Sequence, residues 1–164
     1  GARRMCVLLG DFLRKTLKVS TLDSIPLADE LALVDAFIGI EEVRFGSRLT
    51  VERQIDESAL TCRVPPLLLQ PLIENAVRHA IAPRESGGAI TIEGGRSGDT
   101  LRVSIVDDGP GVGEGSRSNG HGRIGLANTR DRLRVLYGDR GQLALVNVPG
   151  GGTRATVEIP FRRR

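Results

Sequence analysis

The stretch Asp107–Gly113, DDGPGVG, decides how the rest of this chain is interpreted. Before it, Leu101, Val103 and Ile105 alternate with polar residues, which is the period of two that is typical of a half-buried strand. A carboxylate at the end of a strand, followed by glycines, suits a ligand that needs one hydrogen bond and close approach of the main chain. An ordinary turn has the same composition, so this stretch alone leaves both interpretations open.

A second informative stretch is PPLLLQPLIENAVRHAIA, at residues 65–82. Prolines are tolerated in a first helical turn, so the pattern predicts a helix over residues 66–82. Asn75, Arg78 and His79 stand three or four residues apart and would share its polar face, where the amide oxygen could bind Mg²⁺ and the guanidinium could bind phosphate. A plain solvated helix face explains the same pattern. The apolar face is expected at Leu69, Leu72, Ile73, Ala76 and Ala80.

The third stretch is Gly120–Leu126, GHGRIGL, which leads into an amphipathic pattern. A glycine segment that runs into a helix N-terminus presents unpaired N–H groups to an anion. The sequence contains no G-x-x-x-x-G-K-[ST], and its only lysines are Lys15 and Lys18, which excludes a P-loop. The pattern predicts a helix over residues 125–137, stopped by Gly138. Its inner stripe is expected at Leu126, Thr129, Leu133, Leu136 and Tyr137.

In this order, the three stretches resemble the ATP-binding boxes of the GHKL superfamily, which includes histidine kinases, gyrase, Hsp90 and MutL. Asn75 matches the asparagine of the N box, and Asp107–Gly111 matches the D-x-G-x-G of the G1 box. Gly125-Leu126 ends the G2 box, and Gly150–Thr153 resembles the last glycine element. Three longer segments resemble the sequences of LytS-type sensor histidine kinases: VPPLLLQPLIENAVRHAI, IGLANTRDRLRVLYGD and PGGGTRATVEIP. This resemblance covers nearly the whole chain.

The resemblance implies an ATP site with Mg²⁺. Asp107 would accept a hydrogen bond from the exocyclic amine of adenine, where the carbonyl of guanine would be rejected. Asn75 would hold Mg²⁺, which bridges the phosphates. The stretch from about Gly113 to Gly122 would be a mobile lid over the phosphates. The residues expected to bind ATP are Asn75, Arg78, His79, Asp107, Gly109, Gly111, Val112, Gly122, Arg123, Ile124, Gly125, Leu126 and Thr153.

No residue of the chain is identified with certainty as catalytic. Glu74 is a candidate general base, and a structural carboxylate on the helix surface is the alternative. In other GHKL ATPases the hydrolytic acid occupies the position matched here by Pro71, which favours phosphoryl transfer to a nucleophile delivered from elsewhere. Arg123 stands where a glycine is common in the G2 box. The phosphoacceptor histidine of the family, found in an HFLFN-like motif, is missing, since His79 and His121 are the only histidines.

Composition agrees with one compact domain. The chain has 164 residues, of which 40% are hydrophobic and 26% charged, and its net charge of +3 is too small to indicate a nucleic-acid partner. No apolar run approaches the roughly 18–20 residues of a membrane span. Cys6 and Cys62 lack metal-ligand spacing and are expected to be reduced.

We predict an α+β fold, a two-layer α/β sandwich of the GHKL type with a mixed sheet and helices on one face. Residues 1–46 are expected to be helical, with helices at about 3–19 and 26–45, and to be the remainder of a dimerisation and phosphoacceptor region. Residues 47–164 are expected to form the ATP-binding catalytic domain. Its strands are predicted at residues 48–55, 89–93, 101–107, 142–147 and 154–160.

The leading functional hypothesis is the catalytic part of a two-component sensor histidine kinase. The resemblance implies transfer of the γ-phosphate of ATP to a histidine and then to an aspartate in the receiver domain of a response regulator. It also implies a homodimer through the upstream helices and a cytoplasmic domain in a parent protein anchored in the membrane by an upstream region. We expect this chain to be a piece of that parent, unable to autophosphorylate alone. The alternatives are an anti-sigma-type serine kinase and a nucleotide-sensing module that does not transfer phosphate.

Overall fold

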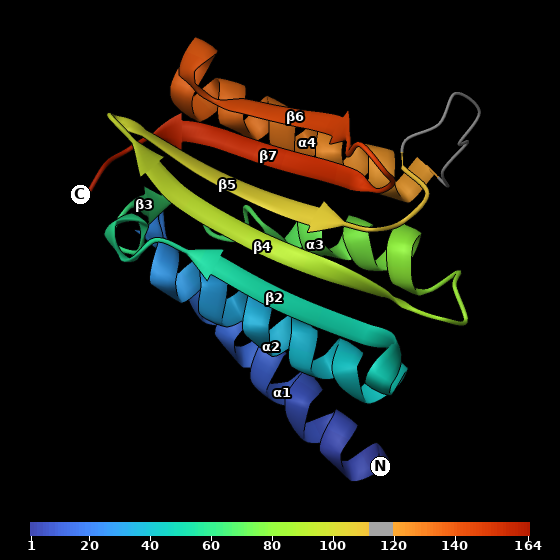
Figure 1. The fold of residues 1–164 in the computed structure, drawn as a ribbon. Helices are drawn as coiled ribbons and strands as arrows, with labels where there is room; N and C mark the ends of the chain where they lie inside the picture. The colour runs from blue at the N-terminus through green and yellow to red at the C-terminus, as the bar shows by residue number, and fades with distance from the viewer. Residues whose placement is uncertain (112–119) are drawn as a thin grey trace.

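The computed structural model describes residues 1–111 and 120–164, and for residues 120–124 it describes the backbone only. One layer of the fold is a five-stranded sheet (Figure 1). The strands follow the order β2-β4-β5-β7-β6; β2 and β4 are parallel, and all other neighbours are antiparallel. This mixed sheet confirms the predicted fold class. The strands are β2 (Leu49–Ile55), β4 (Gly88–Ser97), β5 (Thr100–Asp107), β6 (Gln142–Asn147) and β7 (Thr153–Pro160).

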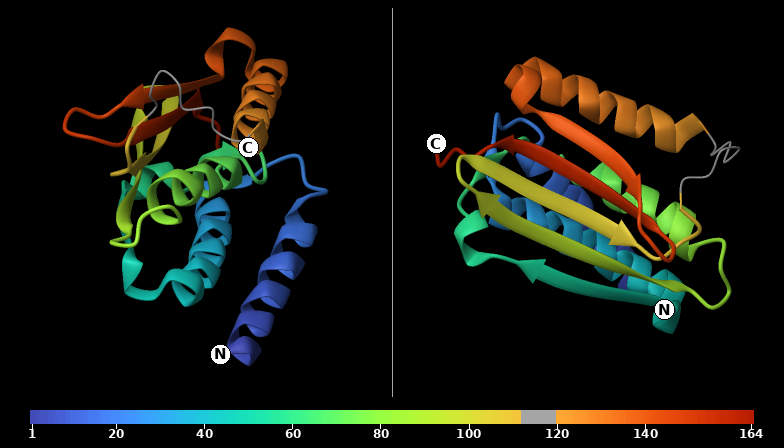
Figure 2. Two further views of the ribbon diagram at one scale, coloured as in Figure 1. Left: turned by 90° about the vertical axis from the view of Figure 1, so that its right-hand side faces the viewer. Right: turned by 45° about the horizontal axis from the view of Figure 1, so that its top comes forward.

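Helices cover one face of this sheet, and the other face is left open (Figures 1 and 2). The covering helices are α2 (Leu27–Phe45), α3 (Gln70–Ala76), which continues as the π-helical turn η3 (Val77–Ile81), and α4 (Gly120–Tyr137). Helix α1 (Ala2–Val19) lies outside them and packs on α2, where the rings of Phe12 and Phe37 have centroids 6.0 Å apart. The remaining elements are the paired short strands β1 (Ile25–Pro26) and β3 (Arg63–Val64) and the 3₁₀ turns η1 (Gly46–Arg48), η2 (Glu57–Ala59) and η4 (Gly138–Arg140).

The core lies between the sheet and helices α2, α3 and α4. Leu101, Val103 and Ile105 of β5 are all buried, as their alternation with polar residues predicts. The predicted apolar face of the helix over residues 66–82 is confirmed, because all five of its residues are buried. Burial of each large apolar side chain stabilises the fold by roughly 1.5–3 kcal/mol. The core therefore fixes the end of β5 and the α3–η3 helix relative to each other.

Helix α3 begins later than predicted, at Gln70 instead of residue 66. The residues before it form a turn and not a helix, and Leu67 has a left-handed φ of 62°. The N–H groups of Leu67 and Leu69 both donate to the carboxylate of Glu30 on α2, so a tertiary contact delays the start of the helix.

Helix α4 begins earlier than predicted, at Gly120 instead of residue 125. Each glycine costs a helix only about 1 kcal/mol relative to alanine, and a helix already formed over residues 125–137 extends without a new nucleation step. Residues 120–122 of the predicted lid are helical, and residues 113–119 lie outside the described part of the chain, so the lid stays a prediction.

Large apolar side chains on two of the helices are exposed. Leu136 is 48% exposed on α4, so its assignment to the inner stripe is wrong, whereas Leu126, Thr129 and Leu133 are buried. On α1, Val7 is 57% exposed and Leu17 is 70% exposed. Helix α1 packs mainly on α2, so much of its surface is left uncovered.

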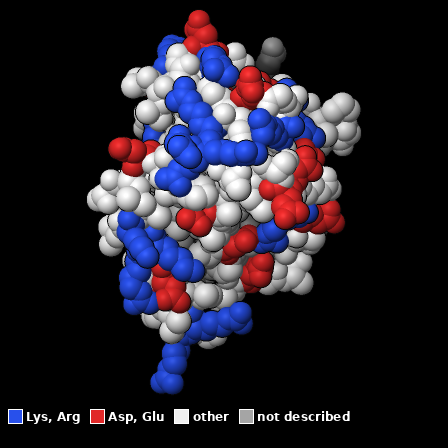
Figure 3. All heavy atoms as spheres, turned by 90° about the vertical axis from the view of Figure 1, so that its left-hand side faces the viewer, with Lys and Arg blue, Asp and Glu red and all other residues white. Residues whose placement is uncertain are grey.

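Charge is mixed on the surface seen from the left of Figure 1. Figure 3 shows groups of lysine and arginine side chains there, separated by aspartate and glutamate. This face therefore carries no single sign of charge. Within the described residues, no helix is both long enough and apolar enough to span a membrane.

We predict that Gly152→Ala destabilises the fold more than Gly150→Ala. Both glycines have a left-handed φ, but a Cβ on Gly152 would lie 1.9 Å from the carbonyl oxygen of Asp107, whereas a Cβ on Gly150 would meet nothing within 4 Å. The expected loss is about 2–4 kcal/mol for Gly152→Ala and roughly 1–2 kcal/mol, from backbone strain alone, for Gly150→Ala. Urea denaturation of both variants measures the difference, and equal losses would show that the contact with Asp107 is not tight.

Candidate functional site

Asp107 lies at the end of β5, in the middle of the sheet. It pairs in register with Ile90 of β4 and Thr153 of β7, so strands flank it on both sides. Its side chain is buried, and Oδ1 accepts hydrogen bonds from the N–H groups of Gly109, at 2.9 Å, and Thr153, at 3.3 Å. Two backbone donors from different segments therefore fix the orientation of this carboxylate.

Burial is the largest influence on the pKa of Asp107 and raises it. The two backbone hydrogen bonds and the nearby His79 oppose this shift, while the charge of Asp108 adds to it. The result is a carboxyl group with a raised pKa, held in place by donors that favour its charged form. A ligand that donates a hydrogen bond to this carboxylate would further offset the cost of burying it.

Glycines let three segments meet closely around Asp107. A Cβ on Gly109 would lie 3.0 Å from Cα and Cβ of Ala80, so the loop after β5 packs directly on η3. Gly111 has a φ of 85°, and a Cβ there would lie 3.3 Å from the carbonyl oxygen of Gly152. The loop after β5, the turn η3 and the loop before β7 therefore converge with bare backbone.

Asp108, the neighbour of Asp107, has a different role. Its Oδ1 accepts hydrogen bonds from the Ala89 N–H at 3.0 Å and from the Arg84 guanidinium at 3.1 Å. Arg84 also donates to the backbone carbonyl of Asp108 at 2.9 Å. Asp108 thus ties the loop after β5 to the start of β4 and to the segment after η3. Sequence reasoning missed this pair, although the doubled acid at residues 107–108 was a signal for it.

The α3–η3 helix places the predicted polar residues on the side of the site. Asn75 and His79 are half-buried and Arg78 is exposed. His79 is close enough to Asp107 to lower the pKa of that carboxyl group by charge. Glu74 is exposed, and its Oε1 accepts a hydrogen bond from Nε2 of Gln70 at 3.0 Å along the same helix.

Helix α4 contributes the second wall beside α3. A Cβ on Gly125 would lie 3.7 Å from Cβ of Pro71, and Leu126 is buried below it. The carbonyl oxygen of Gly125 accepts a hydrogen bond from the Thr129 hydroxyl at 2.9 Å. The described part of α4 therefore lies against the first turn of α3. Of the other residues predicted here, Gly122, Arg123 and Ile124 are helical with undescribed side chains, and Val112 lies outside the described residues.

The donor groups of the site suit Mg²⁺ only in company with phosphates. Among the described residues, no group of three or more histidine, cysteine, aspartate or glutamate side chains could hold a metal ion. Magnesium usually keeps several waters and takes one or two protein oxygens together with substrate phosphates. The half-buried amide of Asn75 fits that role, since it would supply one neutral oxygen.

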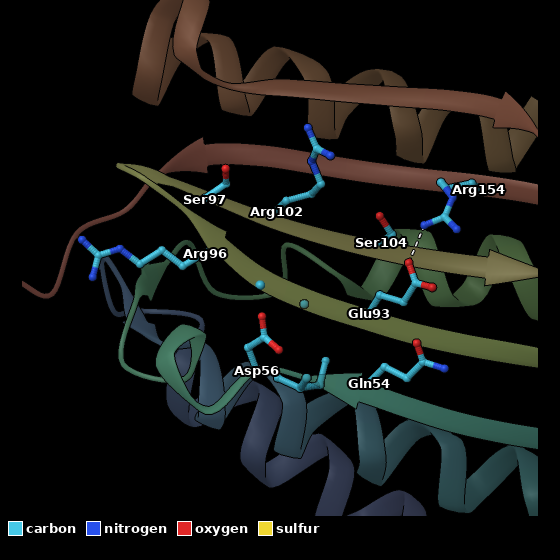
Figure 4. Close-up of a pocket in the computed structure, with 11 residues that line it drawn as sticks. Gln54, Asp56, Glu93, Arg96, Ser97, Arg102, Ser104 and Arg154 are labelled. Atoms are coloured by element: carbon cyan, nitrogen blue, oxygen red, sulfur yellow. Dashed lines mark hydrogen bonds and ion pairs between the residues drawn. The ribbon is translucent and has the colours of Figure 1, made fainter.

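A separate pocket of about 570 Å³ lies on the open face of the sheet, away from Asp107 (Figure 4). Among its polar side chains, Arg154 bonds Glu93 across the strands, and Arg102 bonds Glu158, which lies outside the pocket, at 2.7 Å. None of the residues predicted to bind ATP lines this pocket.

Comparison with protein families gives two matches. The model described as histidine kinase-, DNA gyrase B- and HSP90-like ATPase matches residues 66–163, and the model described as histidine kinase matches residues 1–49. The first match includes every residue predicted to bind ATP.

Curated proteins similar to this chain are sensor kinases. Sensor histidine kinase YpdA of Escherichia coli (strain K12) is 35% identical over 84% of this chain and 25% of that protein. Sensor histidine kinase YesM of Bacillus subtilis (strain 168) is 32% identical over 97% of this chain and 28% of that protein. Sensor protein LytS of Enterococcus faecalis (strain ATCC 700802 / V583) is 28% identical over 99% of this chain and 29% of that protein. This match confirms the LytS-type resemblance. The chain thus spans between a quarter and three tenths of these relatives.

Solved structures confirm the fold. The catalytic domain of histidine kinase ThkA aligns with a TM-score of 0.65 at 19% identity, covering 84% of this chain and 95% of that chain. The histidine kinase domain of the Erythrobacter litoralis EL346 blue-light activated histidine kinase aligns with a TM-score of 0.65 at 22% identity, covering 97% of this chain and 74% of that chain.

We predict that Asp107→Asn stabilises the folded chain at pH 7. The amide keeps an oxygen that can accept the Gly109 and Thr153 hydrogen bonds and removes a buried charge. Because burial raises the pKa of Asp107, folding opposes its ionisation; this penalty is full above the folded-state pKa and absent below the ordinary value of 3.8. The advantage of the variant should therefore shrink as the pH falls. Thermal unfolding at several pH values measures it, and a clear loss of stability at pH 7 would contradict the prediction.

Proposed function

Because this chain belongs to the family of histidine kinase-, DNA gyrase B- and HSP90-like ATPases, we propose that it binds ATP between the end of β5 and the α3–η3 helix. The observation that carries the proposal is the buried carboxylate of Asp107, whose Oδ1 is fixed by two backbone donors among bare glycines. A fixed carboxylate can accept a hydrogen bond from the exocyclic amine of adenine and would repel the carbonyl of guanine at the same place.

The other residues of the site act on the phosphates and the metal. Asn75 would hold Mg²⁺, which when bound neutralises charge on the phosphates. Arg78 is an exposed cation one turn further along the helix and suits phosphate binding. The further residues proposed to line the nucleotide are His79, Gly109, Gly111, Val112, Gly122, Arg123, Ile124, Gly125, Leu126 and Thr153.

The reaction that this site supports best is phosphoryl transfer and not hydrolysis of ATP. The side chain at position 71, in the first turn of α3 and beside Gly125, is a proline, which cannot activate water. Positioning and charge neutralisation are enough for phosphoryl transfer when another segment supplies the nucleophile. The nucleophile would be a histidine of the longer parent protein, since neither His79 nor His121 lies in an HFLFN-like motif.

The parent protein would be a two-component sensor histidine kinase. Residues 1–46 would belong to its helical dimerisation and phosphoacceptor region and residues 47–164 to its ATP-binding domain. The parent would form a homodimer through its upstream helices. The phosphate would pass to an aspartate of a response regulator; the similar kinase ThkA has been crystallised with its response regulator protein TrrA. The parent would be anchored in the membrane upstream, with this domain in the cytoplasm.

We predict that the chain binds ATP in preference to GTP and that Asp107→Asn removes this preference. The amide can donate to the guanine carbonyl and loses the charge that attracts the adenine amine, so ATP affinity should fall roughly 10- to 100-fold. Asn75→Ala should lose mainly the Mg²⁺-dependent part of the affinity, about tenfold. Calorimetry with non-hydrolysable analogues, with and without Mg²⁺, measures both effects.

The matched control is Arg102→Ala, which removes a charge on the open face of the sheet that pairs with Glu158. Its affinities should equal those of the original chain. If Asp107→Asn and Asn75→Ala also bound like the original chain, the assignment of the site would be wrong.

We also predict phosphoryl transfer to a separate histidine-bearing fragment taken from a relative. With labelled ATP, the fragment should acquire an acid-labile, base-stable label, as expected of phosphohistidine, and Asn75→Ala should abolish the labelling. An acid-stable label on serine would instead support an anti-sigma-type kinase. Binding of ATP without any transfer would support a nucleotide-sensing module.

A further inference from the structure

Charged side chains from one segment of the chain bind both ends of the helix that carries Asn75. The helix in question is α3–η3, and the segment is α2 with the turn η1 that follows it. Glu30 lies in the first turn of α2, and Arg48 ends η1. Glu30 contacts the residues that lead into α3, and Arg48 contacts the residues that end η3. The two helices therefore run in the same direction with both ends tied.

At the N-terminal end, the carboxylate of Glu30 is almost completely buried, with 1% exposure. Oε2 accepts a hydrogen bond from the Leu67 N–H at 2.9 Å, and Oε1 accepts one from the Leu69 N–H at 3.0 Å. Arg132 of α4 donates to the carbonyl of Pro66 in the same loop at 2.7 Å. A buried acid and a cation from two other helices thus fix the entry to α3.

At the C-terminal end, the guanidinium of Arg48 donates to the carbonyl of Arg84 at 2.7 Å and more weakly to that of Ile81 at 3.3 Å. Its planar group also lies over the ring of Phe45, 5.3 Å from the centroid. Gly87, with a φ of 72°, approaches so closely that a Cβ would lie 1.9 Å from the carbonyl oxygen of Arg48. The side chain and the backbone of Arg48 therefore both contact the segment that ends the helix.

The polarity of these contacts matches the helix. An acid at the N-terminal end and a cation at the C-terminal end both complement the helix dipole, and both bind backbone groups at or just beyond the helix ends. Each contact joins residues 33 to 39 positions apart in the sequence. Both are therefore tertiary contacts that link α2 to the wall of the nucleotide site.

We propose that Glu30 and Arg48 are positioning residues that together fix the Asn75 helix to α2 and so set the place of Asn75 relative to Asp107. This inference rests on the proposed function, because it assigns the metal-dependent part of nucleotide binding to Asn75. A shift of α2 along its axis would have to carry α3–η3 with it or break hydrogen bonds at both ends. Helix α2 itself packs against α1, so these two side chains connect the N-terminal helices to the wall of the nucleotide site, in addition to the shared core.

The test compares three variants of the chain. Glu30→Gln keeps the shape of the side chain but turns an amide donor toward one of the two loop N–H groups. Arg48→Met removes every donor while keeping an aliphatic stem on Phe45, and Arg48→Lys restores one charged donor. The matched control is Asp35→Asn, which removes a charge from α2 that pairs with Arg53 of β2 and not with α3.

Two readouts separate positioning from stability. Hydrogen exchange without nucleotide reports the two helix ends, at residues 67–73 and 81–87. Affinity for a non-hydrolysable ATP analogue, with Mg²⁺ and with chelator, is measured at a temperature at which circular dichroism shows each variant fully folded. We expect exchange to rise roughly tenfold at the altered end and Mg²⁺-dependent affinity to fall roughly tenfold, with metal-free affinity unchanged. Arg48→Lys should recover part of the loss, and Asp35→Asn should show none.

Unchanged exchange at the helix ends in both Glu30→Gln and Arg48→Met would overturn the proposal, as would faster exchange with unchanged Mg²⁺-dependent affinity. An equal fall of affinity with and without Mg²⁺ would also overturn it, because that result indicates a general loss of structure. If one variant fails to fold, the variants at the other end decide. If the original chain binds no nucleotide, the proposed function fails, and the exchange data alone decide whether the two residues hold the helix.

Discussion

The structure depends on one buried side-chain oxygen at the end of a central strand. Asp107 is flanked by β4 and β7, and its Oδ1 holds the loops that follow β5 and precede β7 through the Gly109 and Thr153 N–H groups. These two hydrogen bonds only partly offset the cost of burying a charge, which is why the pKa of Asp107 remains raised. The surrounding glycines are required by the same arrangement, since side chains at Gly109 or Gly152 would collide with Ala80 or with the backbone of Asp107.

The sequence predicted those parts of the fold that depend on local periodicity. All five strands of the sheet and the inner face of α3 follow from alternation or helical spacing, because each element buries one face. The ends of the helices did not follow. Helix α3 starts at Gln70 because Glu30, 39 residues before Leu69, takes up the N–H groups of the preceding loop. No local pattern contains that information.

The site was predictable to a similar extent. Asp107 and the close backbone around it were predictable from an acid followed by alternating glycines, because only glycine tolerates such approach. The supporting residues were not, since Glu30, Arg48 and Arg84 resemble ordinary charged residues of helices and loops. Their importance comes from the backbone groups that the fold places beside them and that need hydrogen-bond partners. Asp108 was visible as part of a doubled acid, but only the structure separates its structural contact with Ala89 and Arg84 from the role of Asp107.

The different roles of Glu30, Asp107 and Asp108 follow from the groups that each carboxylate contacts. Asp108 is exposed and accepts hydrogen bonds from Ala89 and Arg84, so the chain itself compensates its charge. Burial raises the pKa of Glu30 as it does that of Asp107, but each oxygen of Glu30 already accepts a backbone hydrogen bond. Asp107 is compensated only in part, by two backbone donors that both bind its Oδ1. A carboxylate that the fold leaves under-compensated favours a ligand that can donate a hydrogen bond to it. The same incomplete compensation that weakens the fold at Asp107 is therefore the source of binding energy for an amine-bearing base.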